Sequence, residues 1–431
     1  MNENAAYVGY AYAYPHKTAY RPLDPPLLLR EVWAAENKDA LFLYLHVPFC
    51  EMRCGFCNLF TLSSHQPEEA DDYIDALRRQ ARRVKESLAA VTFARMAIGG
   101  GTPTHLGARR LSDLFDIAQD LGAGACRIPC SIEASPGTTD VDVLKLLRAR
   151  GVARISIGIE TFNEKELAAL RRPERASPYG ALERIRESDV PVLNIDLIYG
   201  IPGQTVGSWL DSLREALRFN PEELYLYPLY VRPLTGLARK GPSTVDRRLE
   251  LYREGRAFLH ASGYRQESMR MFRRSPSPAL KTPDYCCQDD GMVGLGCGAR
   301  SYTTSLHYSS RYAVTQRGVR EIVSDYLNRR DNDFDIADFG VMLGEEEQRR
   351  RWVIKSLLRS EGLSLAAYSA RFGTNVFEDL PELKDLESRQ LARTLEDQFV
   401  LTPQGLELSD AIGAWLYSAP IVERMETCEL R

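Results

Sequence analysis

Six short apolar runs in the first half of the chain alternate with amphipathic segments. The apolar runs predict β-strands near 41–47, 93–100, 128–134, 154–160, 191–199 and 223–231. The segments between them predict helices near 69–88, 108–121, 140–150, 163–171 and 205–218. This alternation is typical of an α/β fold, and six such units predict a parallel sheet curved into a partial barrel. Functional residues are then expected at the carboxyl ends of the strands.

Both ends of the chain depart from this pattern. Residues 1–40 are rich in tyrosine and proline without a clean period, and they predict an arm over the barrel mouth, with Tyr14 to Lys17 reaching the ligand region. Beyond about residue 325, helices followed by a strand–turn–strand pattern predict a winged-helix-like α+β domain. We therefore expect an arm (1–40), a barrel with its extension (41–325) and a C-terminal domain (326–431).

Composition narrows the class of protein. The chain of 431 residues is 44% hydrophobic and 26% charged, which is ordinary for a globular protein. No apolar run approaches the ~20 residues needed to cross a bilayer, and there is no signal-peptide pattern, so we expect a cytoplasmic protein with no membrane partner. A net charge of −4 argues against nucleic acid as a partner. Nine cysteines without a secretory signal indicate thiols and metal, not disulfides.

Three of these cysteines form the strongest chemical signal. Cys50, Cys54 and Cys57 lie on one loop directly after the first predicted strand. Closely spaced thiolates select an iron–sulfur cluster or zinc, and three of them leave one cluster iron open to a ligand. Zinc would need a fourth ligand, for which His46 is the nearest candidate.

Polar residues mark the ends of the next strands. The glycines at 99–101 allow either a simple tight turn or a close approach of the backbone to a ligand. Glu133 and Glu160 end the third and fourth strands, where an ion pair with a neighbouring arginine is the alternative to ligand binding. Asp196 lies within an apolar run, where an acid is costly to bury without a partner.

The spacing C-x3-C-x-aromatic-C, with Phe56 as the aromatic residue, resembles the radical S-adenosylmethionine (SAM) enzymes. Together with the strand-end residues it resembles the subgroup of oxygen-independent coproporphyrinogen III oxidases, heme chaperones and class C radical methyltransferases. The resemblance implies a partial (β/α)6 TIM-like barrel and a [4Fe–4S] cluster on Cys50, Cys54 and Cys57. It also implies S-adenosyl-L-methionine as cofactor, two molecules in this subgroup, and an electron donor such as flavodoxin or ferredoxin.

The same resemblance assigns roles to individual residues. Those implied for the first SAM molecule are Tyr44, Phe56, Gly100, Glu133 and Arg300. Those implied for the second SAM molecule are Gly101, Thr102, Glu160, Arg172, Asp196 and Tyr230. Glu160, Tyr285 and Asp289 are the candidate catalytic residues, and Cys286, Cys287 and Cys297 are expected to be free thiols instead of ligands of a second cluster.

Two departures from the subgroup guide the functional prediction. Leu59 and Glu160 stand where the oxidases carry a cysteine and a glutamine, and the stretch 282–287 lacks the His-Asn…Tyr-Trp run of the chaperones. We therefore predict a class C methyltransferase or cyclopropanase. In this reaction one SAM yields a 5′-deoxyadenosyl radical and the other a methylene radical that adds to an sp2 carbon of a natural-product precursor. A partner methyltransferase belongs to this hypothesis. The alternatives are a coproporphyrinogen oxidase-like decarboxylase and a heme-binding chaperone.

Overall fold

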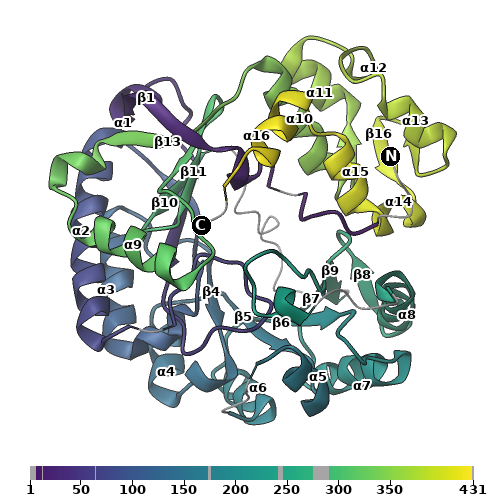
Figure 1. Ribbon diagram of the computed structural model, residues 1–431, viewed down its shortest axis with the longest axis horizontal. Helices are drawn as coiled ribbons and strands as arrows, with labels where there is room; N and C mark the ends of the chain where they lie inside the picture. Colours follow the sequence, from purple (N-terminus) through teal and green to yellow (C-terminus); the bar gives the residue numbers. More distant parts are fainter. Residues whose placement is uncertain are drawn as a thin grey trace.

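The predicted strands form the parallel centre of one large sheet (Figure 1). The structure, a computed structural model, describes residues 6–429 apart from 12, 64, 173–175, 241–245 and 275–290. Neighbouring strands pair in parallel, in the order β2 (Leu41–Val47), β3 (Phe93–Gly100), β4 (Cys130–Ala134), β5 (Arg154–Glu160), β6 (Val192–Tyr199) and β7 (Glu223–Pro228). The prediction of an α/β partial barrel is therefore confirmed.

The helices that connect these strands lie on the outside of the curved sheet (Figure 1). They are α2 (Pro67–Leu88), α3 (Gly107–Asp120), α4 (Val141–Ala149), α5 (Glu164–Ala169), α6 (Pro178–Glu187), α7 (Val206–Leu217) and α8 (Arg248–Ala261). Several start at capping residues; the Asp140 carboxylate, for example, accepts a hydrogen bond from the Val143 N–H. The sequence pattern predicts one helix between β5 and β6, whereas the structure has a second one, α6.

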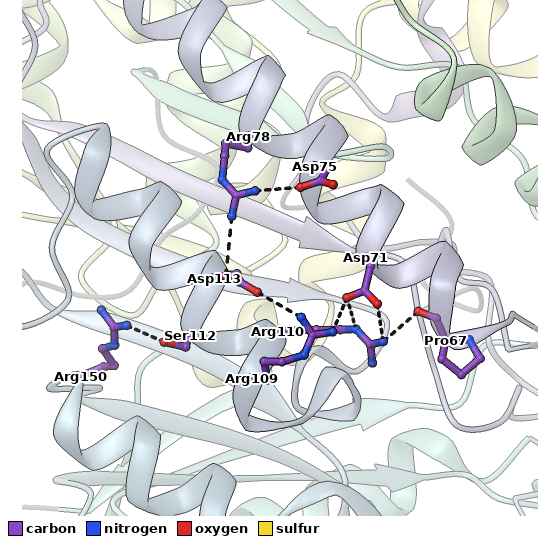
Figure 2. A network of polar contacts seen from close by, with 9 residues as sticks. All are labelled: Pro67, Asp71, Asp75, Arg78, Arg109, Arg110, Ser112, Asp113 and Arg150. Carbon is purple, nitrogen blue, oxygen red and sulfur yellow. Dashed lines mark hydrogen bonds and ion pairs between the residues drawn. The ribbon is translucent and has the colours of Figure 1, made fainter.

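Helices α2 and α3 are also joined on their outer surface by ion pairs (Figure 2). Asp71 of α2 pairs with Arg109 and with Arg110, whose Nε lies 2.8 Å from the Asp71 carboxylate. The Arg110 guanidinium also donates to the Pro67 carbonyl at 2.9 Å. Two guanidinium groups of α3 thereby meet around one carboxylate of α2.

Further strands extend the sheet on both sides. Beyond β7 lie β9 (Met271–Arg274) and β8 (Tyr264–Gln266), and beyond β2 lie β10 (Met292–Leu295), β11 (Arg300–Tyr302), β12 (Leu306–Ser309), β13 (Ile336–Met342) and β1 (Arg21–Leu28). The apolar pattern does not predict β1, because Pro22, Pro25 and Pro26 interrupt it. Its pairing with β13 is irregular between Pro22 and Leu27, as expected for a proline-containing strand at the edge of a sheet.

The C-terminal part combines helices with a small antiparallel sheet. The sheet order is β14 (Leu363–Ser364), β16 (Gln398–Leu401) and β15 (Ala392–Leu395). The helices of this part are α10 (Glu345–Leu357), α11 (Leu365–Phe372), α12 (Val376–Asp379), α13 (Leu383–Ser388), α14 (Pro403–Glu407), α15 (Ser409–Trp415) and α16 (Ala419–Glu426). The winged-helix-like α+β character that the sequence predicts is present here. The preceding helix α9 (Gln316–Leu327) instead packs against α2 of the barrel and contributes to the larger core. In Figure 1, α10, α11 and α16 lie on the side of the ring that the curved sheet leaves open.

Among the described residues, the two largest hydrophobic cores hold these parts. The larger one lies between the sheet and its helices, and the second takes its C-terminal members from Val341 onward. Tyr14, Ala19 and Tyr20 of the N-terminal region belong to this second core. The shorter elements are α1 (Leu29–Val32) and the 3₁₀ turns η1 (Lys17–Ala19), η2 (Pro103–Leu106), η3 (Pro136–Thr138), η4 (Leu237–Lys240) and η5 (Asp331–Phe334).

None of the helices in the described residues is long and apolar enough to span a lipid bilayer.

Candidate active site

A cavity of about 1670 Å³ opens at the carboxyl ends of the parallel strands. The cysteine loop and the ends of β3 to β7 line one side of it. Residues of the N-terminal region, among them His16 and Lys17, and of the C-terminal domain line the rest. Residues from all three parts of the chain therefore surround one space.

The cysteine loop is fixed at its base and at its tip. At the base, the Cys50 N–H donates to the Leu62 carbonyl at 3.1 Å, and the Leu62 N–H donates to the Pro48 carbonyl at 2.7 Å. At the tip, the Gly55 N–H donates to the Leu170 carbonyl at 3.1 Å, and the Gly55 carbonyl accepts from Leu237 at 2.8 Å. The loop is thus held against the barrel on both sides.

The three thiols line the cavity and are not disulfide-bonded. The Thr102 hydroxyl donates to the Cys50 Sγ at 3.7 Å. Burial raises the pKa of Cys50 and of Cys54 to about 12, and the nearby Arg172 guanidinium lowers that of Cys54 in part. Without a metal both thiols are therefore protonated, and a bound cation would replace their protons.

His46 is committed to other partners. Its Nδ1 lies 3.2 Å from the Tyr44 hydroxyl, and its Nε2 lies 3.1 Å from the Phe60 carbonyl oxygen. Both ring nitrogens are engaged, so the imidazole is not placed as a fourth zinc ligand.

The glycines at the end of β3 allow the chain to pass between the cysteine loop and β4. The Gly100 N–H donates to the Glu133 Oε2 at 2.9 Å, with the Gly100 φ at +118°. A Cβ at Gly100 would lie 2.6 Å from the His46 ring, and one at Gly101 would lie 2.5 Å from the Phe49 carbonyl oxygen. No larger residue fits either position without a shift of the backbone around it.

Glu133 points from β4 into the cavity, where its side chain is accessible. Burial within the protein raises the pKa of this carboxyl, and the Gly100 N–H and the positive charge of Arg154 oppose that rise. Arg154 itself is paired with Glu223 at 2.7 Å. The direct partner of Glu133 is therefore a backbone amide and not a neighbouring arginine.

Glu160 is buried at the end of β5 and forms an ion pair with Arg172. Its backbone has a φ of +68°, at an irregularity in the pairing of β5 with β6. Arg172 also donates to the Gly158 carbonyl at 2.7 Å. Burial raises the pKa of Glu160, whereas Arg172 lowers it. The pair closes the end of β5 beside Cys54.

Asp196 is half-buried on β6, where two neutral groups hold it. Ser156 donates to one carboxylate oxygen at 3.0 Å and the Asn194 side chain donates to the other at 2.8 Å. Burial raises the pKa of Asp196 to about 7, although Arg154 and these donors act in the opposite direction. This carboxyl therefore changes charge near neutral pH.

The remaining predicted residues lie around the same cavity. Tyr44, Phe56, Gly101, Thr102, Tyr230 and Arg300 all line it. Tyr230 is beyond the end of β7 and donates its hydroxyl proton to the Asp410 carboxylate. Tyr285 and Asp289, together with Cys286 and Cys287, lie outside the described residues. Cys297 is a buried free thiol.

Comparison with known proteins agrees with this arrangement. Residues 44–216 match the radical SAM superfamily model, and residues 343–408 match the HemN C-terminal domain. The heme chaperone HemW of Escherichia coli is 30% identical over 287 residues, which cover 61% of this chain and 70% of the chaperone. The oxygen-independent coproporphyrinogen III oxidase of Escherichia coli is 29% identical over 388 residues, which cover 85% of this chain and 82% of the oxidase.

The chain belongs to the radical SAM superfamily, in its HemN/HemW subgroup. The solved structure of coproporphyrinogen III oxidase HemN from Escherichia coli matches this radical SAM fold with a TM-score of 0.77 at 25% identity, covering 95% of this chain and 96% of the oxidase. A [4Fe–4S] cluster and SAM are therefore the cofactors that the family implies. Three soft thiols on one fixed loop, open to a large cavity, fit such a cluster with one iron left for SAM.

The prediction of a methyltransferase or cyclopropanase, and with it the transferase class, is wrong. The relatives that match this radical SAM protein over most of its length are oxidases and heme chaperones. The residues of the cysteine loop and of the strand ends serve cofactor chemistry and do not specify the substrate. The departures at Leu59 and Glu160 were therefore too local to decide the reaction.

Two groups of residues around the cavity are not predicted by the sequence. Arg270 and Asp410 form a buried ion pair that anchors Tyr230, and no local pattern predicts their pairing. Arg351, Lys355 and Arg359 line the cavity from the C-terminal domain. Their spacing of four residues is a signal that could have placed them on one helix face.

Proposed function

We propose that this protein is an oxygen-independent oxidoreductase that removes carboxyl groups from a carboxylated tetrapyrrole such as coproporphyrinogen III. The likeness to the oxidase HemN over 95% of this chain carries the proposal. The match leaves out 5% of the 431 residues, which is about 22 residues. This is fewer than the 40 residues that precede the barrel. The likeness therefore extends beyond the barrel into the N-terminal region that lines the cavity.

In the net reaction each reacting side chain loses one hydrogen atom and one electron together with carbon dioxide. A propionate side chain that loses a hydrogen atom from its β-carbon, carbon dioxide from its carboxylate and one electron becomes a vinyl group. The cluster and SAM would supply the hydrogen-abstracting chemistry, and an electron acceptor takes the remaining electron. The protein's own residues orient SAM and the tetrapyrrole and exclude water from the cavity.

The residues around the cysteine loop are suited to hold SAM. In this proposal Cys50, Cys54 and Cys57 hold the cluster, and the Gly100 backbone and Glu133 receive the amino-acid end of SAM. Tyr44, Phe56 and Arg300 line the surrounding wall. An ammonium group near Glu133 would offset the cost of desolvating this accessible carboxylate when SAM binds.

We further propose that a second SAM molecule binds near Glu160, Arg172 and Asp196. The cavity of about 1670 Å³ exceeds the roughly 300–1,000 Å³ of a typical single-ligand site. A sulfonium cation would also stabilise the buried negative charges of Glu160 and Asp196. Anaerobic equilibrium dialysis should give two SAM molecules per cluster-loaded chain, and Asp196→Ala should reduce this to one. A wild-type stoichiometry of one would contradict the second site.

The main test is turnover under anaerobic conditions. The protein is reconstituted with iron and sulfide, supplied with SAM and coproporphyrinogen III, and reduced with flavodoxin or ferredoxin as the proposed donors. We expect release of carbon dioxide and a product lighter by one carbon dioxide and two hydrogens per side chain. Cys54→Ala should abolish both. Heme binding with a shifted Soret band, without any release of carbon dioxide, would instead support a chaperone.

A further inference from the structure

The N-terminal region places a lysine inside the cavity. Lys17 is half-buried and lines the cavity wall. The segment around it is fixed to the C-terminal domain on both sides. Before Lys17, the Tyr14 hydroxyl donates to the Glu347 carboxylate of α10. After it, the Ala19 carbonyl accepts from Arg424 of α16 at 2.9 Å. The backbone of Lys17 therefore has a defined position at the wall.

The side chain of Lys17 has a neutral partner beside the cysteine loop. Its Nζ lies 3.7 Å from the centroid of the Tyr312 ring. The Tyr312 hydroxyl donates to the carbonyl of Asn58, the residue that follows Cys57, at 2.5 Å. Within the described residues no acid is paired with Lys17. The amine thus stands next to the cysteine loop without an anion of its own.

The charges that surround this amine make an anionic ligand favourable. Burial lowers the pKa of Lys17 well below its ordinary value, and the positive charge of Arg300 lowers it further. Arg232 acts in the same direction, whereas Cys57 acts in the opposite one. An amine in this position costs stability as long as no anion is close to it, and a bound carboxylate would remove that cost.

Arg232 approaches the same space from the loop after β7 and also lines the cavity. Its guanidinium donates to the Val8 carbonyl at 3.3 Å and lies 4.6 Å from the centroid of the Tyr230 ring. Both partners are neutral. In the part of the chain that the structure describes, neither Lys17 nor Arg232 is paired with a carboxylate.

The acids at the ends of β4 and β5 do not supply the missing anion, because they have other partners. Glu133 accepts from the Gly100 amide, and Glu160 is paired with Arg172. An anion for Lys17 has therefore to come from a ligand in the cavity.

Building on the proposed function, we propose that Lys17 and Arg232 bind the carboxylate of the substrate side chain that reacts. Lys17 lies at the end of the cavity that holds the cysteine loop, so a propionate bound there brings its β-carbon toward the SAM near the cluster. An ammonium and a guanidinium group suit this role because they form strong charge-assisted hydrogen bonds to carboxylates.

Binding can be measured apart from turnover with coproporphyrin III, the stable oxidised tetracarboxylate, and with its uncharged tetramethyl ester. Fluorescence anisotropy on the cluster-loaded protein should give a Kd for the acid that rises roughly tenfold in Lys17→Met and further in Lys17→Met/Arg232→Met. The Kd of the ester should not change. Lys17→Arg should retain the affinity for the acid.

The stability of Lys17→Met separates a binding role from a structural one. Because the variant removes a charge that has no anion, its Tm without ligand should equal or exceed that of the wild type. A lower Tm together with weaker binding would make Lys17 a structural residue and overturn the inference. Loss of iron from the reconstituted variant would show that the amine serves the cluster and would overturn it as well.

The position of the reacting side chain is tested by the coupling of two products. With coproporphyrinogen III, Lys17→Met should still cleave SAM to 5′-deoxyadenosine but release less carbon dioxide for each 5′-deoxyadenosine than the wild type. This loss of coupling is expected because the β-carbon is no longer held in place. A ratio equal to that of the wild type would assign Lys17 to a carboxylate that does not react, against the inference.

Arg21→Met is the matched control, because Arg21 is a cation of the same segment that does not line the cavity. Its guanidinium donates to the Thr18 carbonyl at 2.8 Å and to the Thr427 hydroxyl at 2.9 Å. Equal weakening of acid binding in this control, or wild-type binding in Lys17→Met/Arg232→Met, would overturn the inference.

The two proposals can fail separately. Binding of the acid that depends on Lys17, without any release of carbon dioxide, would leave the carboxylate site standing and remove the proposed decarboxylation. Release of carbon dioxide with an unchanged KM and unchanged coupling in the double variant would do the reverse.

Discussion

At the scale of single residues, three acids on neighbouring strands have three different environments. Glu133 accepts from a backbone amide, Glu160 is paired with Arg172, and Asp196 is held by neutral donors. Burial raises the pKa of all three acids, and their different partners oppose that rise. Asp196 is the one whose pKa reaches the neutral range.

Asp196 should make stability depend on pH. Its pKa is about 7 in the folded protein against an ordinary value of 3.8, so unfolding releases a proton between these values. The stability that results from this raised pKa is therefore fully present below pH 3.8 and is lost as the pH rises through 7. One pKa unit corresponds to about 1.4 kcal/mol, so the pH-dependent change in the free energy of unfolding is at most about 4 kcal/mol. Because Asp196 is accessible from the cavity, the actual change is smaller.

Asp196→Asn removes this dependence because the amide stays neutral. Urea unfolding of both proteins from pH 4 to 8 should show similar free energies at pH 4 and a growing advantage for the variant up to pH 8. A difference that does not vary with pH would show that Asp196 has an ordinary pKa.

Gly100→Ala should destabilise the protein through both backbone strain and a clash. The residue has a φ of +118°, and the new Cβ would lie 2.6 Å from the His46 ring. Overpacking and strain together predict a loss of about 2–4 kcal/mol in the free energy of unfolding. Gly107→Ala is the control, because Gly107 has a φ of +75° but open space around its Cβ position. Equal losses in the two variants would rule out the clash with His46.

At the scale of elements, the outer helices are joined by charges that do not touch the cavity. Asp71 of α2 forms ion pairs with both Arg109 and Arg110 of α3 (Figure 2). The two arginines hold the pKa of Asp71 below its ordinary value. All three groups are partly exposed, so the pairing stabilises the contact of α2 with α3 only modestly.

Asp71→Asn should lower the Tm by about 1–2 °C at low salt. The difference should disappear in 1 M salt, because exposed charges are screened there. Asp75→Asn is a suitable comparison, since Asp75 pairs with Arg78 alone at 2.8 Å and is more exposed. An Asp71→Asn effect that persists at high salt would indicate packing rather than charge.

At the scale of the whole molecule, one buried ion pair joins the barrel to the C-terminal domain. Arg270 of the loop before β9 and Asp410 of α15 lie 2.6 Å apart, with exposed side-chain fractions of 2% and 0%. Tyr230 donates to the same carboxylate. The wall of the cavity therefore depends on contacts between the two parts.

Asp410→Ala should cost about 3–5 kcal/mol in the free energy of unfolding, because it leaves the Arg270 guanidinium buried without its anion. The double variant Arg270→Met/Asp410→Leu should recover most of this loss in urea titrations. Tyr230→Phe removes one hydroxyl and should cost far less. If the double variant is no more stable than Asp410→Ala, the penalty does not come from the stranded charge.

The sequence by itself determined the strands of the barrel, the cysteine loop and the acids at the strand ends. Periodicity and short spacings encode these features, since they depend on neighbours along the chain. Only the tertiary structure decided which partner each acid has, that Tyr230 is bound by Asp410 across 180 positions, and that α10 faces the cavity. Such contacts depend on how distant elements pack. The sequence therefore predicts the cluster loop but not the residues on the substrate side of the cavity.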